Sequence, residues 1–494
     1  MNRNLTAIAV FTAAILLTPV SPLVDPFEAM LVSSSDDAYL ADLNECTTGL
    51  ALGSATRDGK PLLWKNRDVG TATQEFHYYD DGRIPFISIT YAGDTDEYYG
   101  GVNAAGFALE NSNSYNLDQG PYGGDDDGRI HTQALATCRT VDDFQRLLDS
   151  TNVHGRTLNS NYGAIDAFGN AAMFETAGYE YYRCDAAEAP GGFLVRSNYS
   201  YAGLVGNARP SSWGPHRHDA AYTLFERAVE QNALTPLYVF QRVVRDISIA
   251  ELDPYPLPFD GYFENYPYGC IPNGEAVCRS STRGILVVQG VAANQRPEDA
   301  ILWAMVGSQL SAVATPLWVR AGSVPVEYDG INESRINRRT INLLGFVYTG
   351  GAVNTWRLTN PDGTGLWDFT LPLERWVFDK TERFIRSPQF SYDRLASFQN
   401  EIAQQVADSL EAWQPQYPAT SIVAVEVDGG LVLRWEPPGG APGQNAPARY
   451  RVFRSSTPFR EGDVGALLGE TAELNWRVAD LPAGASFYRV EGVF

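Results

Sequence analysis

Residues 46–68 constrain the fold of this chain more than any other stretch. Two apolar, strand-like runs at 49–55 and 61–64 flank a polar turn at 57–60, which is the pattern of a β-hairpin. Cys46 stands just before the first run, and Asp68 lies 22 positions later, after the second. Because a hairpin returns its end to its beginning, the thiol and the carboxylate are predicted to be neighbours.

A cysteine at this place becomes a self-sufficient nucleophile when it is the first residue of the chain. Its own α-amine, with an ordinary pKa of about 8, then accepts the thiol proton as general base. Asp68 would hold and orient that amine. The mechanism needs no histidine and no cofactor, and the five histidines of this chain form no convincing arrangement. We therefore expect cleavage of the Glu45–Cys46 bond before the protein is active.

Residues 1–45 have the character of a leader. One positive charge within residues 1–4 precedes an apolar run at 5–20, which is typical of a signal-peptide core and is short and Thr-rich for a membrane span. Pro19 and Pro22 interrupt the region where a clean cleavage site would follow. The sequence thus predicts a secreted protein, extracellular or periplasmic, and an uncleaved anchor is the alternative.

Length, charge and cysteine content limit the remaining possibilities. The 494 residues predict two to four domains. A formal charge of −22 repels phosphate backbones and anionic lipid, so nucleic acid is not an expected partner. The acidic run at 124–128 lacks the closing Glu of a calcium loop, and no metal is expected. Cys270 and Cys278 flank a short loop that fits either a disulfide or two free thiols.

The chain after Cys46 divides into two regions of different character. Up to about residue 415, short β-runs alternate with helices, which predicts an α+β layered domain at 46–415. Its clearest signals are a hairpin at 161–176, a capping box at 140–143, helices at 220–231 and 236–246, and an amphipathic helix at 395–413.

Residues 416–494 contain short alternating strands separated by Gly/Pro-rich turns. Strands are predicted at 421–427, 431–435, 449–454 and 487–490. With Trp435 in the second strand, Tyr450 in the third and Leu481 seven residues before Tyr488, this region resembles a fibronectin type III domain. The resemblance implies a small all-β, immunoglobulin-like sandwich that spaces domains or contacts a cell surface or polymer.

Residues 46–68 resemble the nucleophile segment of the choloylglycine hydrolase superfamily of N-terminal-nucleophile hydrolases. That superfamily includes penicillin V acylases, bile salt hydrolases, acyl-coenzyme A:6-aminopenicillanate acyltransferase-like amidases and a family of cysteine dipeptidases. The shared pattern is present here as Cys46-Thr47, Asp58-Gly59 and Asn66-Arg67-Asp68. The resemblance implies a four-layer αββα sandwich that cleaves amide bonds.

The similarity continues to about residue 325. The strand 101–106 leads to Asn113, where the family has an oxyanion-hole asparagine, and Asn198 stands where the family has a second polar asparagine. Arg283 ends a segment that resembles the one with the catalytic arginine, and nearby Arg279 is the alternative. The catalytic set implied by the resemblance is Cys46, Asp68, Asn113, Asn198 and Arg283.

One position departs from the bile salt hydrolases. They carry an arginine immediately before the closing asparagine, and this chain has Lys65. Lysine keeps the positive charge that favours a thiolate but lacks the planar guanidinium fork. This difference argues against a bile salt as the substrate. Lys65 and Asn66 are expected to contact the substrate.

The mechanism implied is acyl transfer through a thioester on Cys46. Asn113, with Asn198 or a backbone N–H, would stabilise the oxyanion, and the α-amine would protonate the leaving amine. The expected substrate is a linear amide: an N-acyl amino acid, an acyl-amine or a β-lactam side chain, with acyl transfer to an amine as a side reaction. A cysteine dipeptidase and a non-catalytic surface binding protein on the same scaffold are the alternatives, and a homo-oligomer is compatible with the sequence.

Overall fold

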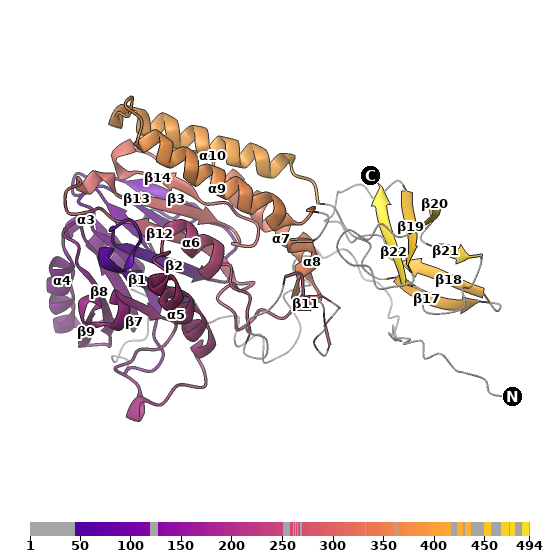
Figure 1. The fold of residues 1–494 in the computed structure, drawn as a ribbon. Coiled ribbons are helices and arrows are strands. Elements are labelled where there is room, and N and C mark those ends of the chain that lie inside the picture. The colour runs from indigo at the N-terminus through magenta and orange to yellow at the C-terminus, as the bar shows by residue number, and fades with distance from the viewer. Residues whose placement is uncertain are drawn as a thin grey trace. The chain divides into compact units, whose positions relative to one another are not determined.

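The computed structural model describes most of the chain, in two compact units (Figure 1). Of the described residues, those from 45 to 415 form the first unit and those beyond 415 the second. The predicted leader, Glu45 excepted, lies outside the described residues, as does most of the acidic run at 124–128. The described residues are 45–118, 127–249, 257–259, 261, 263, 265–266, 269–330, 332–360, 363–415, 422–427, 430–435, 449–455, 466–473, 475–479 and 487–493.

Two antiparallel sheets form the centre of the first unit. The six-stranded sheet has the order β10 (Phe193–Arg196), β1 (Cys46–Ala51), β2 (Leu62–Asp68), β12 (Thr282–Gln289), β13 (Ile301–Val306), β14 (Thr315–Leu317). The seven-stranded sheet is a meander of β3 (Gln74–Tyr79), β4 (Phe86–Tyr91), β5 (Gly101–Asn103), β6 (Ala108–Asn113), β7 (Ser160–Ile165), β8 (Ala171–Thr176) and β9 (Tyr181–Asp185).

The sheets face each other and helices cover their outer sides. Strands β1 and β2 contact β6 and β7, and every residue of β1 and β2 is buried, as expected for a sheet covered on both faces. The layers therefore follow the order helix, sheet, sheet, helix, and the predicted α+β class is confirmed for this unit. Against the seven-stranded sheet lie α3 (Asp127–Thr137) and α4 (Val141–His154); against the six-stranded sheet lie α5 (Pro215–Glu230), α7 (Arg335–Val347), α9 (Leu366–Ile385) and α10 (Leu395–Ala412).

Several locally encoded elements form where the sequence predicts them. The hydroxyl of Thr140 accepts the Asp143 backbone N–H, and the Asp143 carboxylate accepts that of Thr140, so the predicted capping box begins α4. The hairpin predicted at 161–176 is β7–β8. The apolar side of α4 packs through Phe144 on Tyr162 and Phe174 of that hairpin. Along α9 and α10, the rings of Phe384 and Phe398 stack with centroids 3.9 Å apart.

Other elements differ from the prediction or were not predicted. The helix predicted over 236–246 is a short α6 (Pro236–Tyr238) that continues as a π-helical turn, Val239–Val243. All five cysteines are free thiols, so Cys270 and Cys278 are not joined. No helix of the described residues is long and apolar enough to span a bilayer. The remaining elements are β11 (Cys270–Ile271), β15 (Tyr348–Thr349), β16 (Ala352–Asn354), α8 (Thr355–Leu358) and short 3₁₀ turns at Gly53–Ala55, Ala186–Glu188, Pro190–Gly192, Val205–Asn207, Pro297–Asp299, Val319–Ala321 and Tyr392–Arg394.

The second unit consists of two three-stranded antiparallel sheets. Their shared core includes Leu433 and Val478 from one sheet and Tyr450, Val452 and Val490 from the other. All four predicted strands are present, whereas β20 and β21 were not predicted. The sheets are β17 (Ile422–Val427)–β18 (Gly430–Trp435)–β21 (Asn475–Val478) and β20 (Ala466–Thr471)–β19 (Arg449–Ser455)–β22 (Phe487–Val493).

Candidate active site

The β1–β2 hairpin brings the candidate nucleophile and the candidate carboxylate together. Cys46 is the first residue of β1 and Asp68 the last of β2, and Cys46 pairs with Arg67 in the antiparallel register. The Asp68 backbone N–H donates to the carbonyl oxygen of Glu45 at 3.0 Å. The hairpin therefore closes as the sequence predicts, with the Glu45–Cys46 bond beside Asp68.

The backbone nitrogen of Cys46 is held by an asparagine from a distant part of the chain. Asn198 accepts the Cys46 N–H with its Oδ1 at 3.0 Å, and the same oxygen accepts Arg217 Nη2 at 2.9 Å. The Asn198 Nδ2 donates to the carbonyl oxygen of Asn113 at 3.0 Å. Asn198 thus holds the nitrogen that is predicted to become the α-amine. One N–H of its NH₂ group bonds the main chain at Asn113, and its role as an oxyanion donor stays a prediction.

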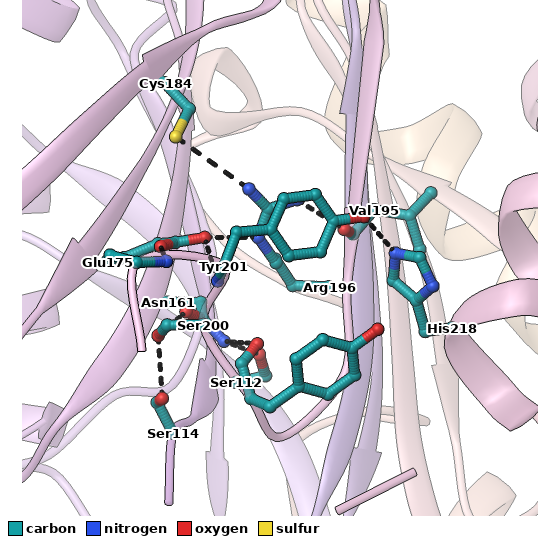
Figure 2. Close-up of polar contacts among 12 residues, drawn as sticks. Ser112, Ser114, Asn161, Glu175, Cys184, Val195, Arg196, Ser200, Tyr201 and His218 are labelled. Carbon is teal, nitrogen blue, oxygen red and sulfur yellow. Dashed lines mark hydrogen bonds and ion pairs between the residues drawn. The ribbon is translucent and has the colours of Figure 1, made fainter. Parts of the chain in front are cut away.

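The turn that carries Asn198, residues 197–201, is fixed by buried side chains of the opposite sheet. Ser112 Oγ donates to the carbonyl oxygen of Ser197 at 2.6 Å. Asn161 Nδ2 donates to the carbonyl oxygens of Ser197 and Tyr199 at 3.2 and 3.1 Å. Figure 2 shows Ser112 and Asn161 close to each other and to Ser200 of the turn. Because each bond joins β6 or β7 to this turn, the position of Asn198 depends on the packing of the two sheets.

A buried ion pair supports the far end of the same turn. Glu175 Oε1 accepts Arg196 Nε at 2.7 Å, and both side chains are 1% exposed. The Glu175 carboxylate also accepts the backbone N–H groups of Tyr201 at 2.9 Å and Ala202 at 2.7 Å (Figure 2). One carboxylate therefore balances a buried guanidinium and terminates the turn that holds Asn198.

A cavity of about 550 Å³ lies beside this turn, lined in part by Arg196 and Tyr201. The Tyr201 hydroxyl lies 2.6 Å from His218 Nε2, and His218 Nδ1 lies 2.8 Å from Asp219 Oδ1. Burial lowers the pKa of His218. A second, smaller cavity is lined by Cys46 and shares no lining residue with this one. We therefore assign the chemistry to the smaller cavity, which is described below.

The carboxylate of Asp68 is buried, and nearby arginines and one hydroxyl partly offset the cost of burying its charge. Its Oδ1 accepts the Thr282 hydroxyl at 2.6 Å, and its Oδ2 lies 3.7 Å from Arg279 Nη1. Burial raises the pKa of Asp68, whereas the charges of Arg279 and Arg217 act in the opposite direction. An ammonium group on Cys46 would further favour the charged form of this carboxylate.

Glu45, the last residue of the predicted leader, is anchored by two arginines. Its Oε2 accepts Arg217 Nη1 at 2.8 Å and also pairs with Arg279 Nη1. Burial alone would raise the pKa of Glu45, but the two guanidinium groups hold it below its ordinary value. The residue before the candidate nucleophile therefore occupies a defined anion position.

A small cavity opens at the Cys46 thiol on the side of the seven-stranded sheet. Burial raises the pKa of Cys46, while the positive charges of Lys65 and Arg67 oppose this and the charge of Asp68 adds to it. Lys65 Nζ donates to Asn111 Oδ1, and the Arg67 guanidinium lies 3.8 Å from the centre of the Tyr99 ring. The cavity residues are Cys46, Lys65, Arg67, Tyr91, Tyr99, Asn111, Asn113 and Asp127.

Two predicted site residues need correction. Asn66 donates its Nδ2 to the carbonyl oxygens of Val277 at 3.0 Å and Val244 at 3.4 Å, so its amide supports the main chain and is not among the cavity residues. Arg283 donates Nη1 to the carbonyl oxygen of Thr282 at 3.0 Å. Arg279 instead pairs with Glu45 and lies near Asp68, which makes it the better candidate for the catalytic arginine.

One cluster has the residue types of a metal site. Ligand atoms of Glu75, His77 and Asp329 lie within 4.8 Å of one another. Glu75 Oε1 is 2.6 Å from His77 Nε2, and its two oxygens accept the backbone N–H groups of Gly93 at 2.6 Å and Gly330 at 3.2 Å. Since these protein groups satisfy the carboxylate, we treat the cluster as a structural ion pair.

Arg217 is the site residue that the sequence did not indicate. It lies on α5, between His216 and His218, and its side chain is fully buried against Glu45. No local pattern distinguishes Arg217 from a surface arginine, because its partners Glu45 and Asn198 are distant in sequence.

Comparison with known proteins gives one family match. Residues 54–208 match the family of acyl-coenzyme A:6-aminopenicillanic acid acyl-transferase, a range that includes Asp68, Asn113 and Asn198. No curated protein matches this chain. Similar solved structures are penicillin V acylase from Agrobacterium tumefaciens (12% identity, 55% of this chain and 86% of that one, TM-score 0.34) and a variant of conjugated bile acid hydrolase from Clostridium perfringens (11% identity, 58% and 94%, TM-score 0.36). The family match shows that residues 54–208 of this chain are similar to this acyl-transferring family.

Proposed function

We propose that this protein is a secreted cysteine amidohydrolase that cleaves a linear amide through a thioester on Cys46, once the Glu45–Cys46 bond is cut. The observation that carries the proposal is the fixed position of the Cys46 nitrogen on Asn198 Oδ1, beside Asp68 and above a cavity that contains the thiol. Cys46 and Asp68 thus stand at the adjacent ends of one hairpin, which supports the arrangement that an N-terminal nucleophile requires.

The proposed reaction has two acyl-transfer steps. The α-amine takes the thiol proton, and Cys46 Sγ attacks the amide carbonyl. The resulting ammonium gives its proton to the leaving nitrogen as the C–N bond breaks and the thioester forms. Water then attacks the thioester, releasing a carboxylic acid and restoring the thiol. Burial raises the pKa of Cys46, and the charges of Lys65 and Arg67 oppose this rise. Asn113 lines the cavity, and we assign it the role of oxyanion donor.

The substrate class separates two forms of the proposal. An acylase recognises an acylated amine, whereas a dipeptidase needs a free amino terminus. We expect the mature protein to hydrolyse an N-acyl amino acid with a kcat/KM at least about 10-fold above that for a dipeptide with the same scissile bond. The free ammonium group of the dipeptide would be buried in an acylase site without a partner, and such an unpaired charge lowers kcat/KM by about this factor. Release of the amine is the measurement. A preference for the dipeptide would overturn the acylase form, and cleavage of neither substrate would favour a surface binding protein.

The proposed domain arrangement is a leader at 1–45, a catalytic domain at 46–415 and a fibronectin type III-like domain at 416–494. Support for the last comes from its two three-stranded sheets with one core. We assign it a spacing or surface-contact role. Support for export comes from the apolar run at 5–20.

A further inference from the structure

Glu45 occupies an anion site that remains after the leader has gone. Its carboxylate is bound by Arg217 and Arg279, whose side chains are 0% and 15% exposed. The arginines come from α5 and from the segment before β12, so cleavage of the Glu45–Cys46 bond removes the carboxylate and leaves both guanidinium groups in place. A bound carboxylate is thereby exchanged for an open site with two buried donors.

The groups that stay behind do not balance the two charges. Arg217 keeps its hydrogen bond to the neutral Asn198 Oδ1 at 2.9 Å, and Arg279 keeps Asp68 Oδ2 at 3.7 Å. Asp68 then faces Arg279, Arg217 and the new α-amine of Cys46, and the exposed Glu275 adds one further negative charge near Arg279. Burying an uncompensated guanidinium is unfavourable, so the mature site favours a ligand that supplies a negative charge.

The position of Glu45 also defines where that charge belongs on a substrate. The Glu45 carbonyl carbon is bonded to the Cys46 nitrogen, and it marks the place of an acyl carbon within reach of Cys46 Sγ. In a glutamyl residue, three carbon atoms separate this carbonyl carbon from the side-chain carboxyl carbon. An acyl group whose carbonyl carbon lies next to this position, with a carboxylate at the same spacing, would bring that carboxylate to Arg217 and Arg279.

We propose that Arg217 and Arg279 form a carboxylate subsite that selects amides whose acyl group carries a terminal carboxylate, as in glutaryl and N-acylglutamyl amides. The inference rests on the proposed function, because it assigns the acyl side of the same thioester reaction. The leader would then act as a substrate analogue that fills the subsite until cleavage.

The direct test compares two 4-nitroanilides on the mature protein, one with a glutaryl group and one with the isosteric 4-carbamoylbutanoyl group. We expect a kcat/KM ratio of about 10 to 100 in favour of the glutaryl substrate, as for a charged hydrogen bond at a buried site. Arg217→Gln is expected to lower this ratio towards one, with partial recovery in Arg217→Lys. The matched control is Arg335→Gln on α7, whose side chain pairs on the surface with Asp408 and Glu411.

A binding measurement tests the subsite without turnover. N-acetylglutamate and N-acetylglutamine differ only in the side-chain charge, and each mimics the end of the leader. We expect N-acetylglutamate to protect Cys46 from alkylation at a concentration at least about 10-fold lower than the concentration of N-acetylglutamine that gives the same protection. Equal protection by the two compounds, or equal hydrolysis of the two anilides, would overturn the proposed subsite. Neither result would contradict the proposed amidase activity. Selective protection by N-acetylglutamate without hydrolysis of any amide supports the subsite and overturns the proposed function.

Discussion

Replacing Cys46 by alanine is expected to lower amide hydrolysis by at least about a thousandfold, because the thioester cannot form without the thiol. Cys46 lines a small cavity together with Lys65 and Arg67, and its backbone N–H donates to Asn198 Oδ1. The measurement is kcat/KM for the best substrate of the amide panel. If the leader is removed by self-cleavage, the intact mass of Cys46→Ala also stays that of the unprocessed chain.

The matched control is Cys138→Ala. Cys138 is a buried thiol in the core between α3, α4 and the seven-stranded sheet, and it is not among the cavity residues. The control shortens a cysteine by the same atom, so it separates the chemistry of Cys46 from a general effect of losing a buried thiol. Hydrolysis by Cys46→Ala at more than a tenth of the rate of Cys138→Ala would contradict the nucleophile assignment.

Replacing Glu175 by alanine is expected to destabilise the first unit by about 3–5 kcal/mol, because the Arg196 guanidinium stays buried without its carboxylate. The same change removes the acceptor of the Tyr201 and Ala202 backbone N–H groups, which end the turn that holds Asn198. The free energy of unfolding is obtained from urea denaturation. We also expect kcat to fall, since the Cys46 nitrogen loses a fixed acceptor.

The control for this loss is Glu401→Ala on α10. Glu401 pairs with Lys380 at 2.7 Å, but the two side chains are 53% and 26% exposed. Exposed pairs contribute about 0–1 kcal/mol, so this variant is expected to stay close to the parent in stability. A loss in Glu175→Ala no larger than that in Glu401→Ala would show that the buried pair does not organise the turn.

Features encoded over short distances in the sequence were predicted well. The hairpin at 46–68 and the capping box at Thr140 depend on residues within one turn or one strand pair, and both form as expected. The helix at 236–246 is the partial exception. Its signal was helical, but residues 239–243 adopt a π-helical turn, a difference of hydrogen-bond register that side-chain periodicity does not specify.

The alternation of side chains along a strand explains the error at Asn66. Lys65 and Asn66 were both expected at the substrate because they are adjacent in the motif. Successive side chains of a strand point to opposite faces of the sheet, and only Lys65 belongs to the face with the Cys46 cavity. The motif identified the strand, whereas the pleat decides which of its residues reach the site.

The arginines at Glu45 were beyond prediction for a different reason. Arg217 and Arg279 reach Glu45 from residues 172 and 234 positions away along the chain. Their convergence depends on how α5 and the segment before β12 pack around the hairpin, which no local pattern in one sequence encodes. The sequence indicated Arg279 only as the alternative to Arg283, and it did not indicate Arg217 as a site residue.

The central claim is tested most directly by the N-terminal sequence and intact mass of the protein exported by its own kind of host. The account predicts a mature chain that begins at Cys46, so that α-amine and thiol belong to one residue next to Asp68 and Asn198. A mature chain that begins elsewhere and keeps Cys46 internal would contradict it, because the thiol would then have no amine to act as its base.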